Sequence, residues 1–119
     1  NPGAIVDSYL LRSLALAGWS PSITSCAVSG DVGDHRAFAV SLGGVVSDAL
    51  APPGTPRLAD GGKELLQALM EGDWSVIENT PEQVSAQVSG FVAAYAQFHL
   101  ERHVRSLAHL ERVVSEKVS

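Results

Sequence analysis

The feature that most constrains the fold is a long run of helix-like apolar spacing that begins at Pro81. Residues three and four apart share one face of a helix. This spacing therefore predicts a long helix with an aromatic stripe, formed by Val84, Val88, Phe91, Tyr95 and Phe98. Thr80-Pro81-Glu82-Gln83 supplies a capping hydroxyl, a proline for the first helical position and a glutamine three residues after the cap. That order is a capping-box start signal.

Other apolar residues lie on different faces of the same expected helix. Val92, Leu100, Val104 and Leu107 fall outside the aromatic stripe. A helix that is apolar on several faces is usually buried. We therefore expect a central helix, covered on more than one side, as in the core of a bundle.

Two shorter helices are expected before it. Ala4–Ala17 carries apolar residues at mixed three-to-four spacing with Gly18 as a stop, and we expect it to be buried on most sides. Lys63–Glu71 repeats leucines at helical spacing and is followed by Gly72, a C-terminal stop signal. A brief apolar cluster follows at Trp74, Val76 and Ile77.

Between these two helices the apolar period changes from helical to strand-like. Ala37–Val40 and Val45–Val46 are short apolar runs separated by Leu42-Gly43-Gly44, and the glycines suit a tight turn. Ala51–Pro56 holds three prolines and reads as an irregular connection. The expected class is mostly α: a single domain over residues 1–119, a helical bundle with a zinc-ribbon-like β-hairpin insertion at about residues 26–50.

Composition narrows the classes of function. The 119 residues carry a net charge of −5, which argues against this segment being a strong electrostatic binder of nucleic acid on its own. One cysteine, Cys26, excludes an internal disulfide and favours a reducing compartment, the cytoplasm. No run reads as a membrane span or signal peptide. The first residue is Asn1 rather than Met, so we expect a fragment of a longer protein.

A metal site is suggested by spacing and opposed by residue type. Cys26 to Ser29 and Ser47 to Leu50 are two i, i+3 pairs with seventeen residues between them, the spacing of a zinc ribbon. Zinc needs thiolate or imidazole ligands, and only Cys26 among these four can provide one. We therefore expect no metal and no other cofactor. The alternative is a loop and hairpin held together by apolar contacts.

His99 and His103 form a second candidate metal pair because residues four apart share a helical face. A zincin helix has its general base, Glu, directly after the first histidine, whereas this chain has Leu100 there and Glu101 one step later. Two surface histidines are the favoured interpretation. A metal-dependent hydrolase using His99 and His103 remains the alternative.

The charge is distributed unevenly along the chain. Residues 1–100 have a net charge of −6 and residues 101–119 a net charge of +1. Arg102 extends the stripe of Phe91, Tyr95 and Phe98, and Arg105 lies beside it. Such a surface suits an acidic or carboxylate-terminated peptide. The simpler interpretation is a cationic helix end on a solvated face.

Several segments together resemble the DNA repair protein RecO family of the actinobacterial type. The resemblance rests on their order and spacing and covers almost the whole chain. The segments are Tyr9-Leu10-Leu11-Arg12-Ser13-Leu14-Ala15-Leu16-Ala17-Gly18-Trp19-Ser20-Pro21, Cys26-Ala27-Val28-Ser29-Gly30, His35-Arg36-Ala37-Phe38, Gly43-Gly44-Val45-Val46, Ser89-Gly90-Phe91-Val92-Ala93-Ala94-Tyr95, His99-Leu100-Glu101-Arg102 and Arg105-Ser106-Leu107.

The resemblance implies a fold and a set of partners. RecO chains have an N-terminal oligonucleotide-binding barrel, absent here, followed by a helical domain with a zinc-ribbon-like insertion. They are non-enzymatic mediators of the RecF pathway, located in the cytoplasm with the nucleoid. They bind single-stranded DNA, anneal complementary strands, engage the acidic C-terminal tail of single-stranded-DNA-binding protein, and load RecA together with RecR. Most of the DNA affinity is expected from the barrel.

The chain departs from zinc-bearing relatives at Ser29, Ser47 and Leu50, where those have cysteine. The recognised motifs do not fix the tail-binding residues, so Arg102 and Arg105 rest on the spacing argument. A slot near Arg12, between the first helix and the long helix, is the competing location. An acidic helical adaptor unrelated to DNA repair is the remaining alternative to the RecO interpretation.

Overall fold

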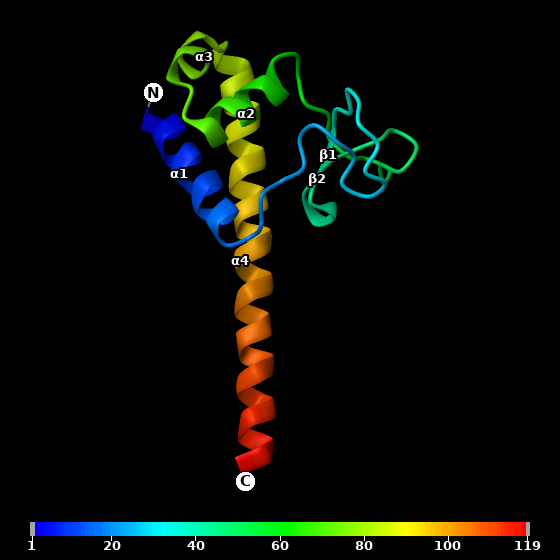
Figure 1. The fold of residues 1–119 in the computed structure, drawn as a ribbon, viewed down its shortest axis with the longest axis vertical. Coiled ribbons are helices and arrows are strands. Elements are labelled where there is room, and N and C mark those ends of the chain that lie inside the picture. Colours follow the sequence, from blue (N-terminus) through cyan, green and yellow to red (C-terminus); the bar gives the residue numbers. More distant parts are fainter. Residues whose placement is uncertain (1, 119) are drawn as a thin grey trace.

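A 37-residue helix, α4 (Glu82–Val118), carries the rest of the molecule on its first half. The structure is a computed structural model that describes residues 2–118, with side chains for residues 3–117. In Figure 1 the helices α1 (Pro2–Leu16) and α3 (Trp74–Asn79) lie on one side of α4, α2 (Gly62–Glu71) crosses its upper part, and the β-hairpin lies on the other side. The mostly helical class with a hairpin is confirmed.

The main core lies where α1 and α2 pack on α4. Its largest members are almost fully buried; they include Leu11, Leu66, Leu69, Val88 and Val92. Two polar residues of α1 are also buried and both find partners. The Ser8 hydroxyl donates to the carbonyl of Leu69 at 2.7 Å, and Ser89 of α4 donates to the Asp7 carboxylate at 3.3 Å. Burial raises the pKa of Asp7, and the hydrogen bond from Ser89 opposes that effect.

The hairpin connects two apolar clusters because its residues alternate between its faces. β1 (Ala37–Ala39) pairs antiparallel with β2 (Gly44–Val46), with Phe38 opposite Val45. Phe38 and Val45 belong to the main core. The remaining strand side chains join Cys26 in a second, smaller cluster of Cys26, Ala37, Ala39 and Val46. All three residues of each strand are therefore buried.

The turn between the strands requires glycine at two successive positions. Gly43 has φ +98° and ends the 3-10 turn Val40–Leu42. Gly44 has φ +140°, and a Cβ there would come within 2.3 Å of the Ser22 carbonyl oxygen. This close approach lets the N–H of Val45 donate to that same carbonyl at 2.9 Å. The expectation of a hairpin with a Gly-Gly turn is confirmed.

Aromatic contacts attach the hairpin to α4. The Phe38 ring stacks on Phe91 with centroids 5.1 Å apart and meets the edge of Tyr95 at 6.3 Å. The Tyr95 hydroxyl donates to the carbonyl of Trp19 at 2.7 Å, which fixes the loop after α1. Burial raises the pKa of Tyr95 to about 12.

The expected start of the long helix is correct to within one residue, but the expected cap is wrong. α4 begins at Glu82 rather than at Pro81. The Thr80 hydroxyl donates backward to the carbonyl of Val76 at 2.8 Å, so it caps the end of α3 instead of the start of α4. The apolar cluster at Trp74 was not recognised as a helix, and it forms α3.

The expectation that α1 is buried on most sides is wrong. Ile5, Val6, Tyr9 and Leu16 are exposed, Leu16 at 92%. Only one face of α1 packs on the core, through Ala4, Leu11 and the partly buried Leu10 and Leu14. The apolar residues on its other faces therefore form surface.

The expectation that the long helix is covered on more than one side holds only for its first half. Leu100, Val104 and Leu107 are exposed, and the helix continues alone to the end of the described chain (Figure 1). The reason is length, since the helices and hairpin that pack on α4 are too short to reach its second half. No described helix contains an apolar stretch of the kind that crosses a lipid bilayer.

Replacing Tyr95→Phe tests the link between α4 and the loop after α1. The variant leaves the Trp19 carbonyl without its buried donor, and we expect a loss of about 0.5–1.5 kcal/mol in the free energy of unfolding. Urea denaturation followed by circular dichroism measures this loss. Tyr9→Phe is the matched control because Tyr9 is 71% exposed, and its stability should equal that of the parent. Equal stability of both variants would contradict the assigned role of the Tyr95 hydroxyl.

Candidate functional site

Two of the ribbon positions, Ser29 and Ser47, lie against Cys26, although neither of their side chains is a zinc ligand. The N–H of Gly30 donates to the carbonyl of Cys26 at 2.9 Å, and the N–H of Leu50 donates to the carbonyl of Ser47 at 3.0 Å, so each pair spans a tight turn. The N–H of Ser47 points at the Cys26 sulfur, 3.3 Å away. The two turns therefore face each other as in a ribbon.

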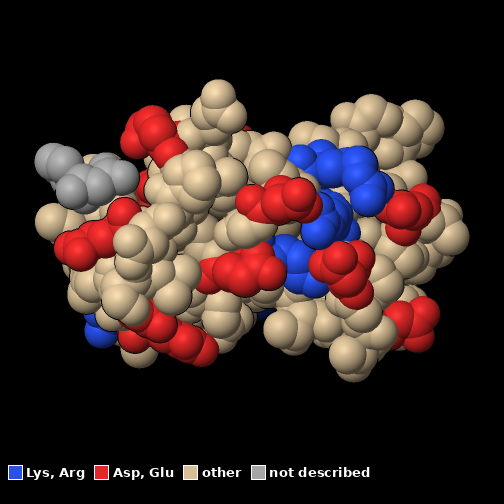
Figure 2. Space-filling model, turned by 90° about the horizontal axis from the view of Figure 1, so that it is seen from above, with Lys and Arg blue, Asp and Glu red and all other residues tan. Residues whose placement is uncertain are grey.

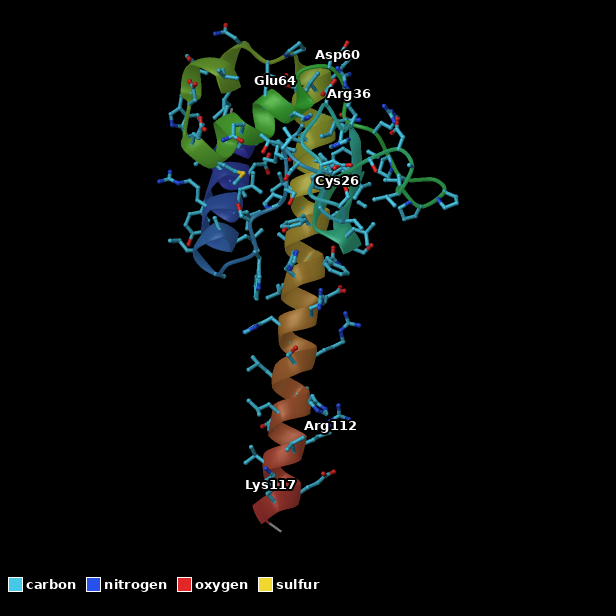
Figure 3. All side chains as sticks on the ribbon, turned by 45° about the vertical axis from the view of Figure 1, so that its right-hand side comes forward. Cys26, Arg36, Asp60, Glu64, Arg112 and Lys117 are labelled. Atoms are coloured by element: carbon cyan, nitrogen blue, oxygen red, sulfur yellow. The ribbon has the colours of Figure 1, made fainter. Side chains whose placement is uncertain are left out.

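Cys26 is buried at 2% exposure, beside the hairpin (Figure 3), and its sulfur also receives hydrogen bonds. A hydrogen bond from the Ser29 side chain, with backbone hydrogen bonds from Ser29, Ser47 and Val28, lowers the pKa of the thiol to about 6. Within residues 3–117 no three His, Cys, Asp or Glu side chains gather in a group that could hold a metal ion. Leu50, at the fourth position, is 45% exposed and has no donor atom.

His99 and His103 are used for packing. Trp19 stacks on His99 with centroids 5.5 Å apart and meets His103 at 5.6 Å. His99 also contacts the Tyr95 ring at 4.4 Å, and its Nε2 atom is buried without a hydrogen-bond partner among the described residues. Burial, with the positive charge of Arg102, lowers the pKa of His99. Both histidines therefore contact Trp19, and this arrangement does not support a hydrolytic metal centre.

The aromatic stripe is divided between core and surface. Tyr95 is 2% exposed and Phe91 is half-buried under Phe38, so neither lines an open slot. Phe98 is half-buried and its ring lies 5.6 Å from the Arg102 guanidinium carbon, a cation–π contact. Of the residues expected to form one surface, the structure brings together Phe98 and Arg102 and leaves Arg105 exposed elsewhere on the helix.

A cavity of about 360 Å³ opens beside Arg102, where the loop after α1 crosses α4. We call it the distal cavity. Its lining is polar and partly aromatic, and Arg105 is absent from it. The lining residues are Trp19, His99, Arg102, His103 and Ser106.

A second cavity, about 400 Å³, lies on the outer face of α1 against Trp74 of α3. We call it the α1 groove. Arg12 stands in it among exposed apolar side chains, and within the described residues Arg12 has no ion pair. The lining residues are Ile5, Ser8, Tyr9, Arg12, Ser13, Leu16 and Trp74.

Sequence reasoning missed the apolar part of the α1 groove. It treated the apolar residues around α1 as buried and Trp74 as part of a cluster. The available signal was that α1 is apolar on almost every face. A small domain has too few other elements to cover all of these faces. An all-round apolar helix in a small domain is either buried or a docking surface.

The remaining cations near the hairpin are already paired. Lys63 approaches Asp34 at 3.3 Å, Arg36 pairs with both Asp34 and Asp60, and Arg57 pairs with Asp48. In Figure 2 the blue Lys and Arg atoms on this face are bordered by red Asp and Glu atoms. The hydrogen bond from Lys63 and the charge of Arg36 lower the pKa of Asp34. This face therefore presents little free positive charge to a polyanion.

Comparisons with a family model and with a curated protein agree with each other. The family model described as "Recombination protein O C terminal" matches residues 1–108. The curated DNA repair protein RecO of Thermobifida fusca (strain YX) is 44% identical over 112 residues, which cover 94% of this chain and 46% of that protein. The chain thus spans about half the length of the curated relative. No solved structure gives a significant match.

The ribbon geometry predicts that three substitutions create a zinc site. The triple variant Ser29→Cys, Ser47→Cys, Leu50→Cys supplies four thiols on two facing turns, the ligand set of a structural zinc ribbon. We expect one zinc per chain and an increased melting temperature, because the energy of zinc binding adds to folding. Metal analysis after dialysis and cobalt absorption spectra measure this.

Ser29→Cys alone is the control for the zinc prediction, since two thiols leave the coordination incomplete. The parent chain, with one thiol, is expected to retain no zinc. A triple variant that folds but takes up no metal would show that the two turns do not face each other as described.

Proposed function

Because this chain belongs to the family of recombination protein O C-terminal domains, we propose that it is the partner-binding half of a non-enzymatic recombination mediator. The family places the chain in DNA repair and recombination. The finer assignment is that the domain engages partner proteins and supports the annealing of single-stranded DNA and the loading of RecA, with RecR as one partner. The proposed location is the cytoplasm, with the nucleoid.

The charge distribution supports a division of labour between this domain and the rest of a RecO protein. DNA affinity comes mainly from neutralising phosphates with Lys and Arg. Here the net charge is −5, and the cations near the hairpin are paired with carboxylates. Protein partners, which bind through apolar surface with a few charges, suit this domain better.

The chain alone is therefore expected to bind single-stranded DNA weakly. Fluorescence anisotropy with a labelled oligonucleotide at moderate salt measures the affinity, and full-length RecO of Thermobifida fusca is the comparison. We expect the domain to bind at least about tenfold more weakly than the full-length protein, since most phosphate contacts are absent. Comparable affinities would contradict the proposed division.

We assign the acidic tail of single-stranded-DNA-binding protein as a further partner. Such a peptide ends in an apolar residue with a free carboxylate and needs an apolar slot beside a cation. The observation that carries this proposal is the α1 groove, where Arg12 lies among Ile5, Tyr9, Leu16 and Trp74 and forms no ion pair with another described residue. The distal cavity is the second candidate, with Arg102 as its cation.

The α1 groove fits this ligand better than the surface expected from spacing. Tyr95 is in the core and Phe91 lies under the hairpin, so Phe98 is the member of that stripe left beside Arg102. In the α1 groove the exposed fractions of Tyr9 and Leu16 are 71% and 92%, which leaves apolar area free to be covered. Burial of such area gives about 25 cal/mol per Å².

Calorimetric titration of the tail peptide separates the two locations. We expect Arg12→Ala to weaken binding about tenfold or more, because a hydrogen bond to a charged group contributes about 1.5–3 kcal/mol. Arg105→Ala is the matched control, since Arg105 lines neither cavity, and should leave the affinity unchanged. If Arg102→Ala weakens binding and Arg12→Ala does not, the distal cavity is the site. If all three variants fold and bind the peptide as the parent does, both the α1 groove and the distal cavity are rejected as the peptide site.

A further inference from the structure

The second half of α4 carries an apolar stripe that packs on no described element. We call it the distal stripe. Its residues are between 52% and 61% exposed and none belongs to either core cluster. It consists of Leu100, Val104, Leu107, Leu110 and Val114. An isolated patch of this size in a monomer marks a surface that another molecule covers.

The distal stripe continues the face of α4 that the body of the domain already covers. Ser89 bonds to Asp7 of α1, and Val92 is buried in the main core. Leu107 lies eighteen residues after Ser89, and Leu110 lies eighteen residues after Val92. Eighteen residues are five turns of a helix with 3.6 residues per turn, so the members of each pair lie on the same face of α4. α1 ends at Leu16, and the same face then runs on uncovered (Figures 1 and 3).

The positions of the stripe are symmetric about Leu107. Apolar residues stand three and seven positions before it, at Val104 and Leu100, and three and seven positions after it, at Leu110 and Val114. A helix lying antiparallel to its own copy, with a two-fold axis at Leu107, therefore meets apolar side chains at each of these five positions, and His103, which falls on the same face, lies level with the partner's Glu111. Leu100 lies level with the partner's Val114, and Val104 with the partner's Leu110. Self-complementarity of this kind is what a two-fold interface requires.

The charge distribution along the chain also favours pairing with a second copy through the second half of α4. Residues 1–100 carry a net charge of −6, so two bodies repel each other, whereas residues 101–119 carry +1. Arg105, His109 and Arg112 lie off the stripe, on the other side of the helix. The distal half of α4 is therefore the part of this acidic chain where two copies can approach with little repulsion.

We propose that the chain forms a two-fold dimer through antiparallel pairing of the distal stripes. The partner helix then covers the face of α4 that continues below α1. This inference is independent of the proposed function. Two helical segments of fifteen residues form an interface at or below the low end of the usual range of about 1,200–2,000 Å², so dissociation constants of tens of micromolar, roughly, are expected.

Sedimentation velocity of the chain from about 5 to 500 µM measures the association. We expect the weight-average mass to rise toward that of a dimer. Leu107→Glu places two carboxylates together at the two-fold axis and should keep the chain monomeric throughout. Leu107 is outside the core, so this variant should retain the parental circular dichroism spectrum.

His109→Glu is the matched control because it adds the same side chain two residues away, on the opposite face of the helix. It should dimerise like the parent. If the parent chain stays monomeric over the whole concentration range, the proposal is overturned. The distal stripe would then be a binding surface for a different protein. A dimer that survives Leu107→Glu overturns it as well.

Cysteine cross-linking tests the direction of the pairing. With a mild oxidant, Leu107→Cys should form a disulfide-linked dimer, because the two positions meet at the axis. Leu100→Cys should not, because in an antiparallel pair it lies level with the partner's Val114. The native Cys26 is buried, so the parent chain gives the background. Cross-linking of Leu100→Cys as strong as that of Leu107→Cys would indicate parallel helices and overturn the antiparallel arrangement.

Discussion

The contact of Phe38 with Phe91 and Tyr95 holds the two parts of this small domain together. On one side of it lies the hairpin, which is too short to be stable alone. On the other side lie the helices. Phe38 is 2% exposed, and burying such a side chain contributes about 1.5–3 kcal/mol, with about 0.5–1.5 kcal/mol more for each aromatic pair. The Tyr95 hydroxyl extends the junction to the loop after α1 through Trp19. The distal cavity, which is lined by Trp19, is built on this junction.

The unequal lengths of the helices explain where the molecule leaves surface for partners. α4 has 37 residues, about 55 Å of helix, whereas α1 has 15, about 22 Å. The chain therefore cannot cover the second half of α4 with its own elements. α1 in turn is covered on one face alone, which leaves Ile5, Tyr9 and Leu16 exposed around Arg12. A RecO domain with two separate apolar surfaces suits an assembly role.

The two turns around Cys26 are held by hydrogen bonds and apolar packing. Hydrogen bonds from Gly30 and Leu50 close the two turns, and Cys26 packs in a small apolar cluster with Ala37, Ala39 and Val46. Flanking segments add hydrogen bonds to both edges of the hairpin: the Ser22 carbonyl accepts from the N–H of Val45 on one side, and the Pro56 carbonyl accepts from the N–H of Phe38 on the other. Main-chain hydrogen bonds thus hold the hairpin between its flanking segments.

The sequence by itself determined the helices α1, α2 and α4, the hairpin and its Gly-Gly turn, and the family, because these depend on local periodicity, on glycine conformation and on the order of short motifs. It did not determine α3, which was expected only as an apolar cluster. It did not determine which apolar faces are buried. Leu11 and Leu16 are the same residue type in the same helix, yet one is 1% and the other 92% exposed. Thr80 has the right neighbours for a capping box but bonds to the preceding helix. Burial depends on which elements reach a face, and that is a property of lengths and packing in three dimensions. Tertiary structure alone therefore placed Arg12 in an apolar groove, moved Tyr95 into the core and left the distal stripe uncovered.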